Sequence, residues 1–147
     1  MLWKSLRASL TSLILGWAVA LLIGACWALL QYQEVSRSFA ANQIAAEFQS
    51  RIDRELWRGS LLLYVQVGVL CAALWWRVVA IQANGLLTGA ITAGAQALFA
   101  VALGSSLLFW IPLVLLITAV GVIAERWRIS SAARPSLGTS SAEHPRH

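Results

Sequence analysis

The apolar stretches of this chain contain few side chains suited to chemistry. The carboxamides of Gln66 and Gln96 are among the most polar, together with the hydroxyls of Thr88, Thr92 and Thr118. Inside lipid, a carboxamide prefers to face another helix and hydrogen-bond there. The helical rise places Gln66 about 9 Å and Gln96 about 12 Å below the same membrane face, so the two side chains could meet. They would either hold helices together, which we prefer, or line a polar path.

Catalytic and metal-binding groups are missing from the same stretches. These contain no Asp, Glu, His or Lys, and their one Arg is Arg77, near an end. A Ser or Thr nucleophile needs a base within reach, and proton-coupled carriers need ionisable groups at depth. His144 and His147 stand in the polar C-terminal stretch, and Cys26 and Cys71 are isolated from each other. We therefore expect no enzyme activity and no bound metal, haem or other cofactor.

Cys26 has two interpretations. The residues Leu-Ile-Gly-Ala-Cys at 22–26 resemble a bacterial lipobox, in which the Cys is acylated and becomes the new N-terminus. Apolar residues continue after Cys26, whereas a lipoprotein usually turns polar there, so a plain apolar side chain is the alternative that we favour. We expect no disulfide with Cys71, because the two depths differ by about 9 Å and a disulfide needs Cα atoms within about 7 Å.

The composition indicates a membrane protein. The 147 residues are 59% hydrophobic and only 12% charged, and the mean hydropathy is +0.72. Soluble domains have about 25% charged residues. Eight Trp point the same way, because Trp collects at membrane interfaces. The net charge of +5 comes from residues that flank apolar segments, which indicates contact with lipid and no nucleic acid.

Four apolar stretches are long enough for transmembrane helices, which need about 20 residues. The first, 8–30, exceeds the apolar region of a signal peptide, about 7–15 residues, and so favours an uncleaved anchor. The second is 60–81. A long uncharged stretch follows, and a turn at Gly104 divides it into 85–103 and 107–124. The sequence thus predicts an all-α, polytopic membrane protein, a four-transmembrane-helix bundle.

Two polar segments complete the predicted organisation. Residues 31–59 carry balanced charges and an apolar stripe at helical spacing, and predict an amphipathic extramembrane helix. It could lie on the membrane surface, the commonest outcome, extend the flanking spans or dock on a partner. The transmembrane domain would then cover 1–128. Residues 129–147, rich in Ser, Ala and Pro, predict a disordered tail.

Basic and aromatic residues predict how the chain is threaded. Lys and Arg are enriched in cytoplasmic segments. With four spans, the basic residues Lys4, Arg7, Arg77, Arg126 and Arg128 all fall on one side. Trp residues would form a belt at each face, and only Trp17 falls in mid-membrane. We therefore expect both termini in the cytoplasm, with the protein in a bacterial inner membrane.

Small residues recur every fourth position in two spans. Such stripes allow close approach of helix backbones, either within one chain or between subunits. The stripes consist of Gly16, Ala20, Gly24 and Ala28 in the first span, and Gly85, Gly89, Ala93 and Ala97 in the third.

Two functions fit this pattern. The first is a non-catalytic accessory subunit or assembly factor of a larger membrane complex, whose partners are other membrane subunits or further copies of itself. The second is a small homo-oligomeric transport, channel or holin-like pore protein. The stripes and the amphipathic segment favour the first, and the Gln and Thr side chains favour the second.

Overall fold

The computed structural model describes the backbone of residues 1–38 and 44–134, and the side chains of these except 32–38, 44–49, 52, 53 and 56. This part of the chain forms four α-helices and no strand: α1 (Leu2–Ser38), α2 (Ile44–Ile81), α3 (Gly85–Ala102) and α4 (Leu107–Ala132). Each helix contains a stretch long and apolar enough to cross a membrane. The prediction of an all-helical chain with four candidate spans is therefore confirmed.

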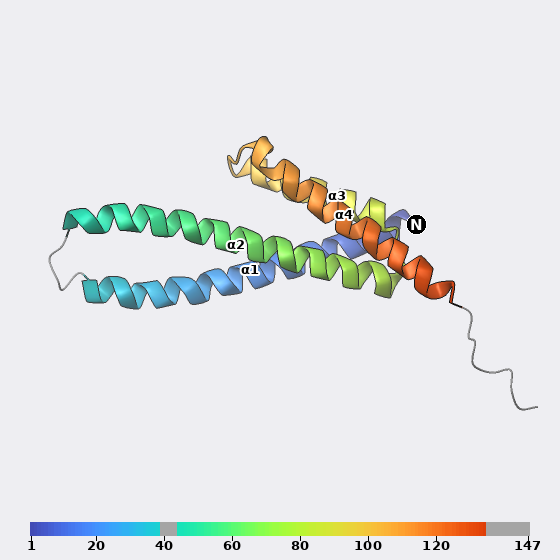
Figure 1. The fold of residues 1–147 in the computed structure, drawn as a ribbon, viewed down its shortest axis with the longest axis horizontal. Coiled ribbons are helices and arrows are strands. Elements are labelled where there is room, and N and C mark those ends of the chain that lie inside the picture. Colours follow the sequence, from blue (N-terminus) through green and yellow to red (C-terminus); the bar gives the residue numbers. More distant parts are fainter. Residues whose placement is uncertain (39–43, 135–147) are drawn as a thin grey trace, which may run out of the picture.

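The helices form two hairpins that pack together at one end of the molecule. Figure 1 shows α1 beside α2 and α3 beside α4, with the N-terminus and the C-terminal end of α4 at the same end. The α1–α2 hairpin extends much further from this end than the α3–α4 hairpin does. The packed core therefore lies towards the end where α1 begins and α4 ends.

The turn between α2 and α3 is closed by backbone and side-chain hydrogen bonds. Gln82 has a left-handed backbone, with φ 52°, and the Ala83 N–H donates to the Val78 carbonyl at 3.3 Å. This closes the last turn of α2 in the Schellman pattern. Asn84 caps α3, since its side-chain oxygen accepts from the Leu87 N–H at 2.9 Å.

The turn between α3 and α4 uses a glycine. Gly104 has φ 84°, a conformation that costs glycine little and other residues more. The Ser105 N–H donates to the Ala100 carbonyl at 3.0 Å, which closes the last turn of α3. Residues 103–106 thus separate α3 from α4.

In the described part of the segment 31–59, residues 31–38 continue α1 and residues 44–59 belong to α2. This corresponds to the alternative in which the segment extends the flanking helices. The segment has no Pro and only one Gly, Gly59, so no residue breaks either helix in the part described. The side chains of its predicted apolar stripe lie outside the described residues.

The last helix also runs beyond its predicted end. α4 continues to Ala132, so residues 129–132 are helical and the predicted start of the disordered tail is too early. The Ser131 hydroxyl donates to the Trp127 carbonyl at 2.9 Å inside this extension. No Gly or Pro occurs between Glu125 and Ala132 to end the helix. The predicted tail beyond Arg134 lies outside the described residues.

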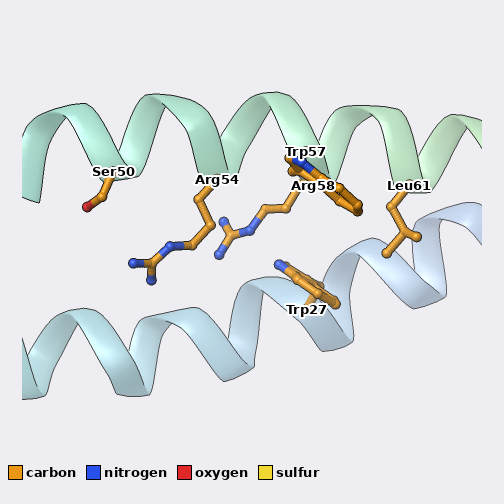
Figure 2. A pocket seen from close by; sticks show the side chains of 6 residues that line it. All are labelled: Trp27, Ser50, Arg54, Trp57, Arg58 and Leu61. Atoms are coloured by element: carbon orange, nitrogen blue, oxygen red, sulfur yellow. The ribbon is translucent and has the colours of Figure 1, made fainter.

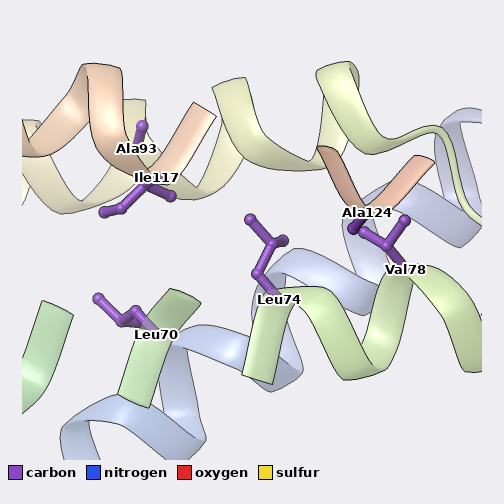
Figure 3. Close-up of a cluster of buried hydrophobic side chains, with 6 residues drawn as sticks. All are labelled: Leu70, Leu74, Val78, Ala93, Ile117 and Ala124. Carbon is purple, nitrogen blue, oxygen red and sulfur yellow. The ribbon is translucent and has the colours of Figure 1, made fainter. Parts of the chain in front are cut away.

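A small apolar core joins three helices. Figure 3 shows α2 facing the α3–α4 hairpin through side chains that are all fully buried. Leu70, Leu74 and Val78 recur at every fourth position, so they lie on one face of α2. The cluster consists of Leu70, Leu74, Val78, Ala93, Ile117 and Ala124.

The closest backbone approach is between α3 and α4, and it depends on three glycines. A Cβ added at Gly89 would lie 3.0 Å from the Thr118 Cα. One added at Gly121 would lie 3.2 Å from the Gly89 Cα. One added at Gly85 would overlap the Gly121 carbonyl oxygen and lie 2.6 Å from the Glu125 Cβ. The two backbones therefore touch over about one helical turn, where any side chain would separate them.

We predict that Gly89→Leu destabilises the protein. Its side chain would press against the α4 backbone, which cannot yield as a flexible side chain would, and overpacking of this kind costs about 1–3 kcal/mol. The free energy of unfolding in mixed detergent micelles would measure the loss.

Gly94→Leu is the matched control. Gly94 lies on the same helix, but a Cβ there meets nothing within 4 Å. This change should leave stability unchanged or raise it by less than about 1 kcal/mol through helix propensity. Equal effects of the two substitutions would show that the glycine contact does not hold α3 to α4.

Candidate functional site

Hydroxyl groups form a polar seam between α1 and α3. Ser5, Ser9 and Ser12 of α1 are buried, as are Thr88 and Thr92 of α3. The Ser9 and Thr92 hydroxyl oxygens lie 2.7 Å apart. The seam joins residues 83 positions apart in the chain, and so fixes the first helix onto the second hairpin.

The direction of the central hydrogen bond follows from its neighbours. The Thr92 hydroxyl donates to the Thr88 carbonyl at 2.8 Å. Because a hydroxyl has one hydrogen to donate, Ser9 is the donor to Thr92. Ser12 donates to the Ala8 carbonyl at 2.8 Å. These hydroxyl hydrogens are therefore used within the protein.

Trp17 and Gln96 continue the seam. The Trp17 indole N–H donates to the Gln96 Oε1 at 3.1 Å. The same indole packs edge-on against Phe99, with ring centroids 4.5 Å apart. Gln96 is 2% exposed. This contact explains why a Trp stands in the middle of an otherwise aliphatic span, since its N–H needs a partner there.

Gln66 does not share this arrangement. It is buried in α2, but its Nε2 has no hydrogen-bond partner. The Gln96 oxygen accepts from Trp17. The structure therefore places Gln96 in a pair with an aromatic donor, and leaves the Gln66 amide unpaired.

The two small-residue stripes occupy different environments. In α3, Gly85, Gly89 and Ala93 are buried, and Ala97 is half-buried. In α1 the exposure increases along the stripe: Gly16 is buried, Ala20 and Gly24 are half-buried, and Ala28 is exposed.

The partners of the two stripes differ as well. Gly16 lies against a side chain, since a Cβ there would approach the Leu70 Cδ2 to 2.6 Å. Gly85 and Gly89 lie against the α4 backbone. The α3 stripe thus makes a backbone-to-backbone contact, and the start of the α1 stripe receives a leucine of α2.

Glu125 closes the end of the bundle where α3 begins and α4 ends. Its Oε2 accepts from the Gly85 N–H at 3.1 Å and from the Leu86 N–H at 3.4 Å. A carboxylate at this position satisfies backbone donors that have no partner inside the helix and complements the helix dipole. Glu125 thus couples the last turns of α4 to the first turn of α3.

The predicted basic end is assembled from separate parts of the chain. Met1, Lys4, Asn84, Glu125 and Arg128 all line one pocket of about 310 Å³. Near it, the Trp75 and Trp127 rings meet edge to face, with centroids 6.0 Å apart. These contacts put the start of α1, the α2–α3 turn and the end of α4 together.

Cysteine positions agree with apolar packing. Cys26 is exposed, Cys71 is half-buried, and both are free thiols. Cys26 lies within an α1 that runs unbroken from Leu2 to Ser38. Ser9 and Trp17, which hydrogen-bond to α3, precede Cys26 on this helix. Within the described residues, no three His, Cys, Asp or Glu side chains group as metal ligands would.

Sequence reasoning missed several residues of the seam. Ser5, Ser9 and Ser12 follow the basic N-terminal residues, and their spacing puts them on one helix face. That spacing was the available signal. Trp17 could be singled out because it is the only Trp that falls in mid-membrane. Its hydrogen-bond partner, Gln96, could not be predicted from the sequence.

We predict that Trp17 and Gln96 are energetically coupled. Gln96→Leu leaves the indole N–H unpaired, and Trp17→Phe removes the donor while keeping an aromatic ring. A double-mutant cycle on unfolding free energies should give a coupling of about 1 kcal/mol, the scale of an interhelical hydrogen bond in membranes.

Gln66→Leu is the comparison variant. It removes an amide that has no partner, so its effect on stability should be smaller than that of Gln96→Leu. Additive effects in the Trp17–Gln96 cycle would contradict the pairing.

Comparison of the chain with protein-family models, curated proteins and solved structures finds no match.

Proposed function

We propose that this chain is a non-catalytic accessory subunit or assembly factor of a larger membrane complex, and that it presents a helical hairpin beyond the bilayer. The observation that carries this proposal is helix length. α1 has 37 residues and α2 has 38, which correspond to about 55 Å each. A bilayer core is about 30 Å thick, so neither helix fits within it.

The surplus length lies at one end. The apolar stretches of the two helices are Leu2–Gln31 and Trp57–Ile81. Residues 32–38 and 44–56 therefore extend from the proposed membrane, by roughly 10 Å on α1 and 20 Å on α2. Figure 1 shows this part of the hairpin standing apart from α3 and α4. A paired helical extension of this kind offers a surface to a partner.

The interior polar groups support a structural role over a transport role. Two hydrogen bonds join α1 to α3, one between Ser9 and Thr92 and the other between Trp17 and Gln96. Groups engaged in this way fix helix positions and are not available to a passing solute. We therefore assign the polar seam to helix packing.

A small homo-oligomeric transport, channel or holin-like pore protein is the second candidate. The observation that favours it is the buried Gln66 Nε2, which lacks a hydrogen-bond partner. Flux into liposomes that hold the purified protein would distinguish the two functions. A flux that changes sharply in Gln66→Leu would favour the pore.

The location follows from the same proposal. The four helices would span a bacterial inner membrane, with both termini in the cytoplasm and the α1–α2 extension outside. Clustering of the basic residues Lys4 and Arg128 around one pocket supports a common side for the termini.

The threading predicts a labelling pattern. In a background with Cys26 and Cys71 replaced by Ala, a Cys introduced at Ser38 or Ser50 should react with an impermeant thiol reagent in intact cells. A Cys introduced at Ser136 should react only after permeabilisation. The opposite pattern would overturn the orientation.

The subunit proposal predicts a position-dependent cross-link. A photoreactive residue at Ser50, exposed on the α2 extension, should cross-link to another protein in the native membrane. The same residue at Leu98, 74% exposed on α3, should cross-link mainly to lipid.

Native size gives the second measurement. After gentle solubilisation, the chain should migrate as part of a larger assembly that contains the Ser50 cross-linked protein. A lone monomer without a cross-link at Ser50 would contradict the proposal.

A further inference from the structure

A cavity lined by arginine and tryptophan lies where the α1–α2 hairpin leaves the apolar stretches. It measures about 480 Å³ and is lined by Trp27 of α1 and by Ser50, Arg54, Trp57, Arg58 and Leu61 of α2. Figure 2 shows both arginine side chains directed from α2 towards α1, with the Trp27 ring facing them. The α2 residues recur at helical spacing, so one face of α2 provides most of the cavity.

Arg58 has an unsatisfied edge. Its side chain is only 13% exposed and its guanidinium lies over the Trp27 ring, 5.7 Å from the centroid. Its Nη1 pairs with the Glu55 carboxylate. Its Nε and Nη2 are buried without a hydrogen-bond partner. These two nitrogens form one edge of the guanidinium, the edge that binds two oxygens of a phosphate or carboxylate side by side.

The position of the cavity indicates which anion is near. Gln31 ends the apolar stretch of α1, and Trp57 begins that of α2. Trp residues at such boundaries lie at the level of lipid headgroups. The Arg58 edge that has no hydrogen-bond partner lies beside this cavity. Such an edge binds an oxyanion, and phosphate esters are abundant oxyanions at the level of lipid headgroups.

We propose that this cavity binds a phosphate ester, carried either by an anionic lipid headgroup or by a soluble phosphoester. The phosphate oxygens would accept from the Nε and Nη2 of Arg58, with the Arg54 guanidinium on the other side. The ester group would lie against Trp27 and Trp57. Because both nitrogens are buried, the Arg58 side chain would have to rotate into the cavity to reach the ligand. This site does not depend on a protein partner.

The first experiment uses the full chain in neutral detergent. Phosphatidylglycerol and phosphatidylcholine, both in short-chain form, are titrated separately, and bound lipid is counted by native mass spectrometry. Soluble glycerol phosphate is titrated in a third arm. Stronger binding of phosphatidylglycerol alone identifies a lipid headgroup, and equal binding of glycerol phosphate identifies a soluble phosphoester. Phosphatidylglycerol bound no more tightly than phosphatidylcholine, with no binding of glycerol phosphate, would overturn the proposal.

The second experiment locates the site. Arg58→Gln should weaken binding of the preferred ligand by about tenfold or more, since it removes a charge-assisted hydrogen-bonding edge. Arg51→Gln removes the same charge from an exposed position on α2 outside the cavity, and should change binding much less. Arg54→Gln, at an exposed position, gives the same test if Arg58→Gln does not fold. Equal losses in the cavity variant and in Arg51→Gln would contradict a specific site.

Discussion

The backbones of α3 and α4 touch at Gly85, Gly89 and Gly121, and the other helix contacts are arranged around that contact. Lipid is as apolar as Leu, so helices inside a membrane gain little from burying Leu against Leu. Association then depends on close backbone packing and on hydrogen bonds between helices. The three glycines supply the first of these, because a Cβ added at any of them would meet backbone atoms of the other helix.

Hydrogen bonds between helices attach α1 to the α3–α4 pair. The Ser9–Thr92 and Trp17–Gln96 contacts both join α1 to α3, and the apolar cluster around Leu70 joins α2 to the same hairpin. The first hairpin is thus attached to the second by polar contacts from α1 and by apolar contacts from α2. α1 contributes to that cluster only through the partly buried Leu13.

Sequence patterns located some of these features, for physical reasons that differ between residues. Gly85 and Gly89 could be recognised because small residues repeat at every fourth position. Gly121 could not, since its neighbours at that spacing are Ile117 and Glu125, and its role depends on which helix faces it. The role of Glu125 could not be recognised, because the position of its acceptor oxygen at the start of α3 is a tertiary contact. The helical pattern of residues 31–59 predicted a helix but not its arrangement. A surface helix, an extension of the flanking helices and a helix docked on a partner would all show the same pattern.

The cap that Glu125 provides has a consequence for biogenesis. A chain made from its N-terminus exposes Gly85 and Leu86 some 40 residues before their acceptor is synthesised. During that interval the first amides of α3 must be satisfied by water or by lipid headgroups, which holds them at the membrane surface. When Glu125 arrives, it replaces those partners and draws the two ends of the second hairpin together. The hairpin is therefore completed only after Glu125 has been synthesised, and a chain truncated before Glu125 would carry all three glycines of the α3–α4 contact and still lack its final closure.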